Sequence, residues 1–107
     1  MQGTLLKGTM AELDLIERHL LMLRAAKENQ PVGIIRLSEI TGIPRHKVRY
    51  SLRLLEKDGL IIATPEGATV SDRYYEYIGE VEASLAAVTD RAAAISKTLD
   101  RDREGRA

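Results

Sequence analysis

The chain has 107 residues, 16 of them Lys or Arg and 16 of them Asp or Glu, so its formal net charge at pH 7 is zero. This length predicts one small domain with a modest core and excludes a large enclosed substrate cavity. The absence of cysteine excludes disulfides and cysteine-ligated zinc, and no apolar run is long enough for a membrane helix or a signal peptide. We therefore expect a cytoplasmic protein in which any binding of a polyanion depends on a local basic patch.

The first helix is predicted to begin at Thr9, after a flexible arm over residues 1–8 that shows no apolar periodicity. The Thr9 hydroxyl and the Glu12 carboxylate have the spacing of a capping box, directly before an apolar run. The apolar positions that follow at helical spacing are Leu13, Ile16, Leu20 and Leu23. This helix should end near the sequence ENQPVG.

Two short helices joined by a tight turn are predicted next. The first covers GIIRLSEIT, and Gly42 then supplies a residue that tolerates positive φ at the turn. The second spans residues 44–57, where Pro44 suits the first helical turn. The inward-facing positions should be Ile34, Leu37 and Ile40 on the first helix and Val48, Leu52 and Leu55 on the second.

A β-hairpin and a long helix complete the chain. Two short β-prone runs flank Pro65, Glu66 and Gly67, which predicts a tight hairpin. The helix that follows should start at about Ser71 and reach Thr98, and residues 100–107 then form a charged tail with little to bury. An unbroken heptad stripe marks residues 74–99, at Tyr74, Ile78, Val81, Leu85, Val88, Ala92, Ile95 and Leu99. Such a helix is about 40 Å long and extends beyond a small core, so we expect the stripe to form a homodimer interface in a coiled coil.

One stretch, LSEITGIPRHKVRYSLRLLEKDGLI, resembles the core of winged helix-turn-helix transcriptional regulators of the MarR, ArsR and PadR type and their small archaeal relatives. The resemblance covers about Met10 to Tyr75, and its most specific part is the spacing between Gly42 and Gly59. It implies a mainly α fold with a small β-hairpin, in which residues 9–73 form a DNA-binding domain. The helix over residues 74–99 would then dimerise two such domains.

The basic segment of the second short helix predicts where DNA would bind. No acidic residue lies between Glu39 and Glu56, and Arg is the best bidentate partner for guanine in the major groove. The residues expected at DNA are Arg45, His46, Arg49, Tyr50 and Arg53, with Lys47 and Arg73 on flanking phosphates. Two features depart from the family pattern. Ile43 and Pro44 occupy the place where a Ser or Thr N-cap is common, and Glu66 replaces a Lys or Arg at the hairpin tip.

Other chemistries have little support in the sequence. The two histidines, His19 and His46, lie on different predicted helices without metal-ligand spacing, and no nucleophile–base pair or phosphate loop is present. We therefore expect no enzyme activity, no cofactor and no metal. Regulators of the type that this sequence resembles often bind a small-molecule effector, and the sequence does not identify one. The alternative function is a protein-interaction module, in which the basic helix meets an acidic partner and the long helix pairs with a different protein.

Overall fold

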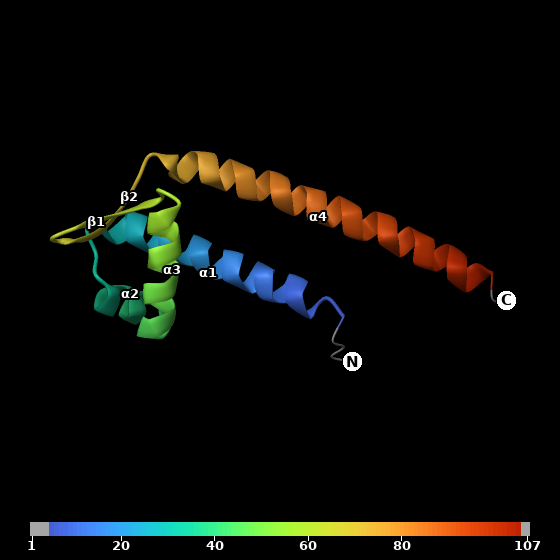
Figure 1. The fold of residues 1–107 in the computed structure, drawn as a ribbon, viewed down its shortest axis with the longest axis horizontal. Helices are drawn as coiled ribbons and strands as arrows, with labels where there is room; N and C mark the ends of the chain where they lie inside the picture. Colours follow the sequence, from blue (N-terminus) through green and yellow to red (C-terminus); the bar gives the residue numbers. More distant parts are fainter. Residues whose placement is uncertain (1–4, 106–107) are drawn as a thin grey trace. The chain divides into compact units, whose positions relative to one another are not determined.

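The computed structural model describes residues 5–105, which form four helices and one antiparallel hairpin (Figure 1). In chain order the elements are α1 (Lys7–Asn29), α2 (Ile34–Thr41), α3 (Arg45–Lys57), β1 (Ile61–Thr64), β2 (Gly67–Val70) and α4 (Arg73–Glu104). The prediction of a mainly α chain with a small hairpin and a long C-terminal helix is confirmed. The chain divides into two compact units, Met1–Tyr74 and Tyr75–Ala107.

The core of the first unit is aliphatic and lies where α1, α2 and α3 pack on one another, with β1 against α3 and β2 against α1. Its most buried side chains are Met22, Leu23, Leu37, Val48, Leu55 and Leu60. Of the predicted inward positions, Ile40 is the exception, because 42% of it is exposed. At about 100° per residue Ile34 and Ile40 lie about 60° to either side of Leu37, so the buried side of α2 is centred on Leu37 and Ile40 lies at its border.

The start of α1 differs from the prediction. The helix begins at Lys7, and its N-cap is Leu6 with φ 65° and no side-chain hydrogen bond to the helix. The amide of Met10 donates to the carbonyl of Leu6 at 2.9 Å, so Thr9 lies inside the first turn and the predicted capping box is wrong. A cap motif favours a helix start without preventing an earlier one. Residues 1–4 of the predicted arm lie outside the described residues.

The turn between α2 and α3 follows the prediction. Gly42 has φ 74°, and its N–H donates to the carbonyl of Ser38 at 2.8 Å. The Ser38 hydroxyl in turn donates to the carbonyl of Ile43 at 2.6 Å, which ties the turn to α2. Pro44 is the N-cap of α3, and its carbonyl accepts from the amides of Lys47 and Val48, both at 3.0 Å. As expected, no side chain caps this helix.

The hairpin pairs Ile61 with Val70 and Thr64 with Gly67, which confirms the hairpin predicted around Pro65, Glu66 and Gly67. Its turn is residues 65–66, and Gly67 is the first residue of β2. The structure adds a contact that the sequence did not predict: Val32 and Ala68 exchange two backbone hydrogen bonds, of 3.1 and 2.8 Å. A Cβ on Gly67 would lie 2.7 Å from the backbone nitrogen of Val32. Glycine is therefore required where the hairpin meets the segment between α1 and α2.

The second unit consists of α4 from Tyr75 onward. The helix has 32 residues and is about 48 Å long. It continues through Glu104, so most of the predicted charged tail is helical; residues 106–107 lie outside the described residues. Two features support this extension: an ion pair between Asp100 and Arg103, and the placement of Arg101 and Arg103 in the last turn, where cations favour the helix dipole.

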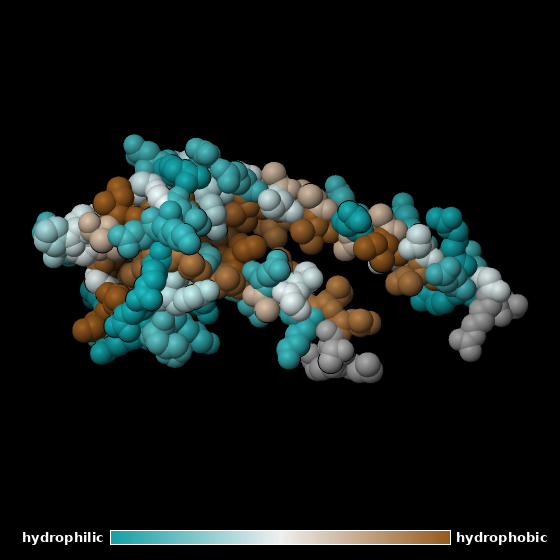
Figure 2. Space-filling model, viewed as in Figure 1, coloured by the Kyte–Doolittle hydropathy of each residue, from teal (hydrophilic) through white to brown (hydrophobic). Residues whose placement is uncertain are grey.

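No described residue of α4 is buried. The outer part of its predicted stripe is exposed: Leu85 by 37%, Val88 by 46%, Ile95 by 54% and Leu99 by 58%. Apolar residues accordingly recur along the surface of this helix (Figure 2). Among the described residues, no helix is both long enough and apolar enough to span a bilayer.

Candidate nucleic-acid interface

The solvent face of α3 carries the residues predicted to meet DNA. The buried residues of this helix are Val48, Ser51 and Leu55, which fixes the side that faces the core. The structure places the six predicted residues of this helix outside, all exposed: Arg45, His46, Lys47, Arg49, Tyr50 and Arg53. The helix has no acidic residue before Glu56, so the face that follows the tight turn at Gly42 carries exposed cations and no carboxylate.

Arg36 on α2 adds a cation that the sequence reasoning missed. It lines a hollow of about 560 Å³ together with Arg45 and Arg49 of α3. Gly33 and Ile34 line the same hollow, so the N-terminus of α2 borders it. Glu39 also borders it and reduces the net positive charge. Helix N-termini and guanidinium groups both suit phosphate oxygens.

Arg18 on α1 holds the neighbouring side of α3. Its Nε donates to the Ser51 hydroxyl at 3.0 Å, and its guanidinium carbon lies 5.8 Å from the centre of the Tyr50 ring. Ser51 is fully buried, so this hydrogen bond satisfies a hydroxyl inside the core. Arg18 thereby positions Tyr50 at the edge of the basic face. The 33 residues that separate Arg18 from Ser51 leave no local sequence signal for this contact.

Lys47 lies on the opposite flank of α3 from Arg49. It lines a hollow between α1 and α3 that also contains Asp14 and Glu17 of α1. Arg18 and Arg24 line the same hollow, so its charged residues sum to +1. Of the predicted residues of α3, Lys47 thus borders α1, whereas Arg49 and Arg53 lie on the hairpin side of the helix.

The hairpin contributes no cation to this surface. Its strands and turn, residues 61–70, include one charged residue, Glu66, which is exposed at the tip. Arg73, predicted to contact a flanking phosphate, has its guanidinium hydrogen-bonded to the carbonyl of Asp58 just after α3. The C-terminal carbonyls of a helix attract cations, so this contact stabilises the end of α3.

Tyr74 and His19 are partly or fully buried within the first unit. Tyr74, the first residue of the predicted dimer stripe, is half-buried, and the ammonium of Lys27 lies 5.7 Å from the centre of its ring. His19 is buried, and its Nδ1 has no hydrogen-bond partner. Burial lowers the pKa of His19 below 6.5, Arg18 lowers it further, and Asp58 partly opposes them. Within residues 5–105, no three His, Cys, Asp or Glu side chains gather where a metal ion could bind.

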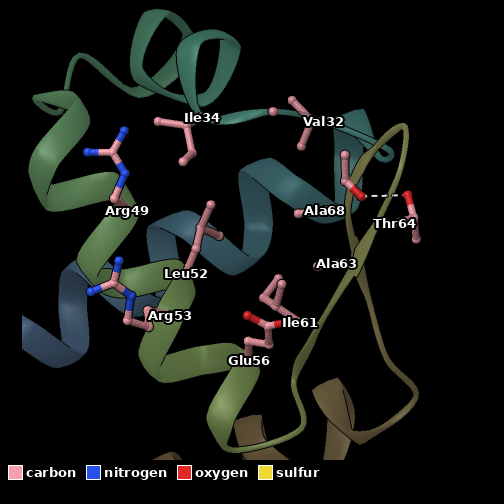
Figure 3. Close-up of a pocket in the computed structure, with 12 residues that line it drawn as sticks. Val32, Ile34, Arg49, Leu52, Arg53, Glu56, Ile61, Ala63, Thr64 and Ala68 are labelled. Carbon is pink, nitrogen blue, oxygen red and sulfur yellow. Dashed lines mark hydrogen bonds between the residues drawn. The ribbon is translucent and has the colours of Figure 1, made fainter.

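A groove runs between α3 and the hairpin (Figure 3). Its volume is about 330 Å³, and Leu52, Ile61 and Ala63 supply apolar surface between the two elements. The side chains of Arg49 and Arg53 extend from one edge of α3, one helical turn apart. The basic face therefore borders an apolar hollow on the hairpin side.

A scan against protein-family models finds no family that matches this chain, and a search of curated proteins finds no match either. The resemblance to winged-helix regulators therefore stays a prediction from the residues of the stretch 37–61.

Proposed function

We propose that this chain is a winged helix-turn-helix transcriptional regulator that binds double-stranded DNA as a homodimer, with α3 in the major groove. The observation that carries the proposal is the exposed, acid-free face of Arg45 to Arg53 on the helix that follows a tight positive-φ turn. A helix placed this way after a turn is the recognition element of helix-turn-helix proteins. Arg49 and Arg53 are then the base-reading residues, and Arg36 and Lys47 contact phosphates.

The homodimer is supported by the exposed stripe of α4. Leu85, Val88, Ile95 and Leu99 recur at coiled-coil spacing, and a helix in a protein gains most of its stability by packing such a face on a partner. A second copy of the same helix supplies a matching stripe. A twofold dimer also presents two recognition helices to the two half-sites of an operator.

Selection of bound sequences from random duplex DNA, followed by anisotropy titrations at two salt concentrations, tests the DNA proposal. We expect affinity to fall steeply with salt, and Arg49→Ala to cost about 1–3 kcal/mol on the preferred site. Lys47→Ala should weaken binding to all sequences alike. Arg101→Ala, which removes the same charge from the last turn of α4, is the matched control and should change neither. Folded protein that shows no duplex binding, or binding insensitive to salt, contradicts the proposal.

A protein-interaction module is the second candidate, because the net charge is zero and the only charge on the hairpin is Glu66. In that case α3 meets an acidic protein surface and α4 pairs with a different chain. Light scattering on the purified protein at tens of micromolar separates the two candidates: a dimer supports self-pairing, and a monomer favours the interaction module.

A further inference from the structure

Tyr50 lies on the face of α3 that points away from the core. At about 100° per residue it is roughly 160° around the helix from Val48 and roughly 140° from Leu55, both of which are buried. Tyr50 itself remains 49% exposed, and Arg53 follows one turn later on the same side of the helix. A largely apolar ring thus borders the cations of the surface that we propose enters the major groove.

Arg18 of α1 fixes the Tyr50 ring from one side. The guanidinium carbon of Arg18 lies over the ring, 5.8 Å from its centre, which is within the range of a cation–π contact. The guanidinium is itself anchored, because its Nε donates to the hydroxyl of the fully buried Ser51 at 3.0 Å. The ring is therefore ordered before any partner arrives, and ordering a binding group in advance raises its affinity.

The chemistry of the ring indicates what it contacts in the major groove. Phosphate oxygens and guanine edges suit the guanidinium groups of Arg49 and Arg53, whereas the face of an aromatic ring suits an apolar group. The base edges in the major groove present donors, acceptors and one apolar group, the C5 methyl of thymine. Cytosine that is methylated at C5 carries the same group. Burial of one such methyl is worth about a fourfold gain in affinity.

We propose that Tyr50 reads the C5 methyl of a pyrimidine in the major groove, and that Arg18 positions the ring for this contact. The inference rests on the proposed function, because it requires α3 to lie in the groove. It adds the reading of an apolar group to the polar contacts of Arg49 and Arg53. Arg18 acts through the ring, so its effect on specificity should disappear when the ring is removed.

The contact between Arg18 and Tyr50 is tested first without DNA. In heteronuclear NMR spectra of the full chain, the Nε–H of Arg18 should exchange slowly, because it donates to the hydroxyl of the buried Ser51. The ring current of Tyr50 should shift this signal, so Tyr50→Ala should move it. Arg24→Gln, at an exposed position of the same helix, is the control and should leave it in place. A signal that Tyr50→Ala does not move overturns the positioning role of Arg18.

Methyl reading is then measured on the duplex that the full chain selects. Uracil replaces each thymine and 5-methylcytosine replaces each cytosine, one position at a time, so that each duplex differs by one C5 methyl. We expect about fourfold weaker binding after the change at one thymine, or about fourfold tighter binding after the change at one cytosine. The first result assigns the methyl to thymine and the second to methylated cytosine. The absence of any such position overturns the inference.

Variants assign the methyl effect to the ring. Tyr50→Ala should bind the duplexes with and without the methyl equally, whereas Tyr50→Phe keeps the ring and should retain the fourfold ratio. Arg18→Gln should bring the ratio closer to one and should add nothing to Tyr50→Ala. Arg24→Gln removes the same charge from α1 and should leave the ratio unchanged. The ratio compares two duplexes on one protein, so a variant that is partly unfolded does not alter it.

Three results separate this inference from the proposed function. If no duplex binds, the proposed function fails and methyl reading fails with it. If duplex binds and every methyl change is without effect, methyl reading fails alone. A fourfold ratio that persists in Tyr50→Ala also overturns it, because another residue then contacts the methyl.

Discussion

The two units of this chain bury their apolar residues in different ways. In the first unit Leu23, Leu37 and Leu55 are at most 1% exposed, and α1, α2, α3 and the hairpin supply one another's contacts. In α4 the stripe positions from Leu85 to Leu99 remain exposed. The first unit contains its own core, whereas α4 has an apolar stripe and, among its described residues, no buried one. Mutations should therefore report on folding in one unit and on association in the other.

The largest expected contrast is between two leucines. Leu23→Ala removes a fully buried side chain and should lower the free energy of unfolding by about 2–5 kcal/mol. Leu99→Ala, at a position 58% exposed, should change the unfolding of the first unit by less than about 0.5 kcal/mol. Urea unfolding of both variants, followed by a probe within residues 5–74, measures the difference. Equal losses would mean that the two units fold as one cooperative body.

Association should be most sensitive near the middle of the stripe. Val88→Asp places a charge at a position that the proposed dimer buries, so it should weaken dimerisation by at least about 2 kcal/mol and leave the first unit folded. Ala83→Asp introduces the same charge on the opposite side of α4 and is the control. Sedimentation equilibrium compares them, and similar effects of the two substitutions would remove the stripe as the interface.

Replacing glycine by alanine should lower stability in the first unit and raise it in α4. Gly42→Ala forces a Cβ onto a backbone with φ 74°, which should destabilise the first unit by about 1 kcal/mol. Gly79→Ala lies within α4, where a Cβ meets no atom within 4 Å, and should stabilise that helix by up to about 1 kcal/mol. Thermal unfolding by circular dichroism tests both. An unchanged melting temperature for Gly42→Ala would place the strained turn elsewhere.

The smallest effect concerns pH and is confined to the first unit. The folded-state pKa of His19 is lowered, so the unfolded chain binds a proton at a higher pH than the folded chain does. Stability should be full above about pH 6.5 and should decline as the pH falls towards the folded-state pKa. His19→Leu should flatten this decline, and the exposed His46→Gln should leave it in place. Unfolding free energies at pH 7 and pH 5 give the comparison, and an unchanged slope in His19→Leu would assign the decline to other groups.

The features that the sequence predicted correctly are those encoded within a few residues. The positive φ of Gly42, the hairpin around residues 65–67 and the burial of Val48 and Leu55 each follow from local residue type or helical period. The two helix ends that the prediction missed, at Lys7 and Glu104, depend on weak cap and charge preferences of about 1 kcal/mol, which several neighbouring positions can satisfy.

The contacts that shape the candidate site were not predictable in this way. Arg18 reaches Ser51 and Tyr50 on another helix, and Val32 pairs with Ala68 across two helices and a strand. These contacts depend on how the helices pack on one another. The spacing of residues along one helix or strand does not specify that packing. The composition of α3 gave the basic residues of the candidate interface, whereas the apolar groove beside them required the tertiary structure.

The pairing of Val32 with Ala68 has a consequence for the order of folding. It closes a loop that contains α2, α3 and the first strand, and the entropy lost on closing such a loop must be offset by contacts already made inside it. The helices form largely from local contacts, so they should assemble before the hairpin docks. The amides of Val32 and Ala68 should then gain protection from hydrogen exchange late in refolding, after the amides of α3, and the groove they border should be the last part of the unit to appear.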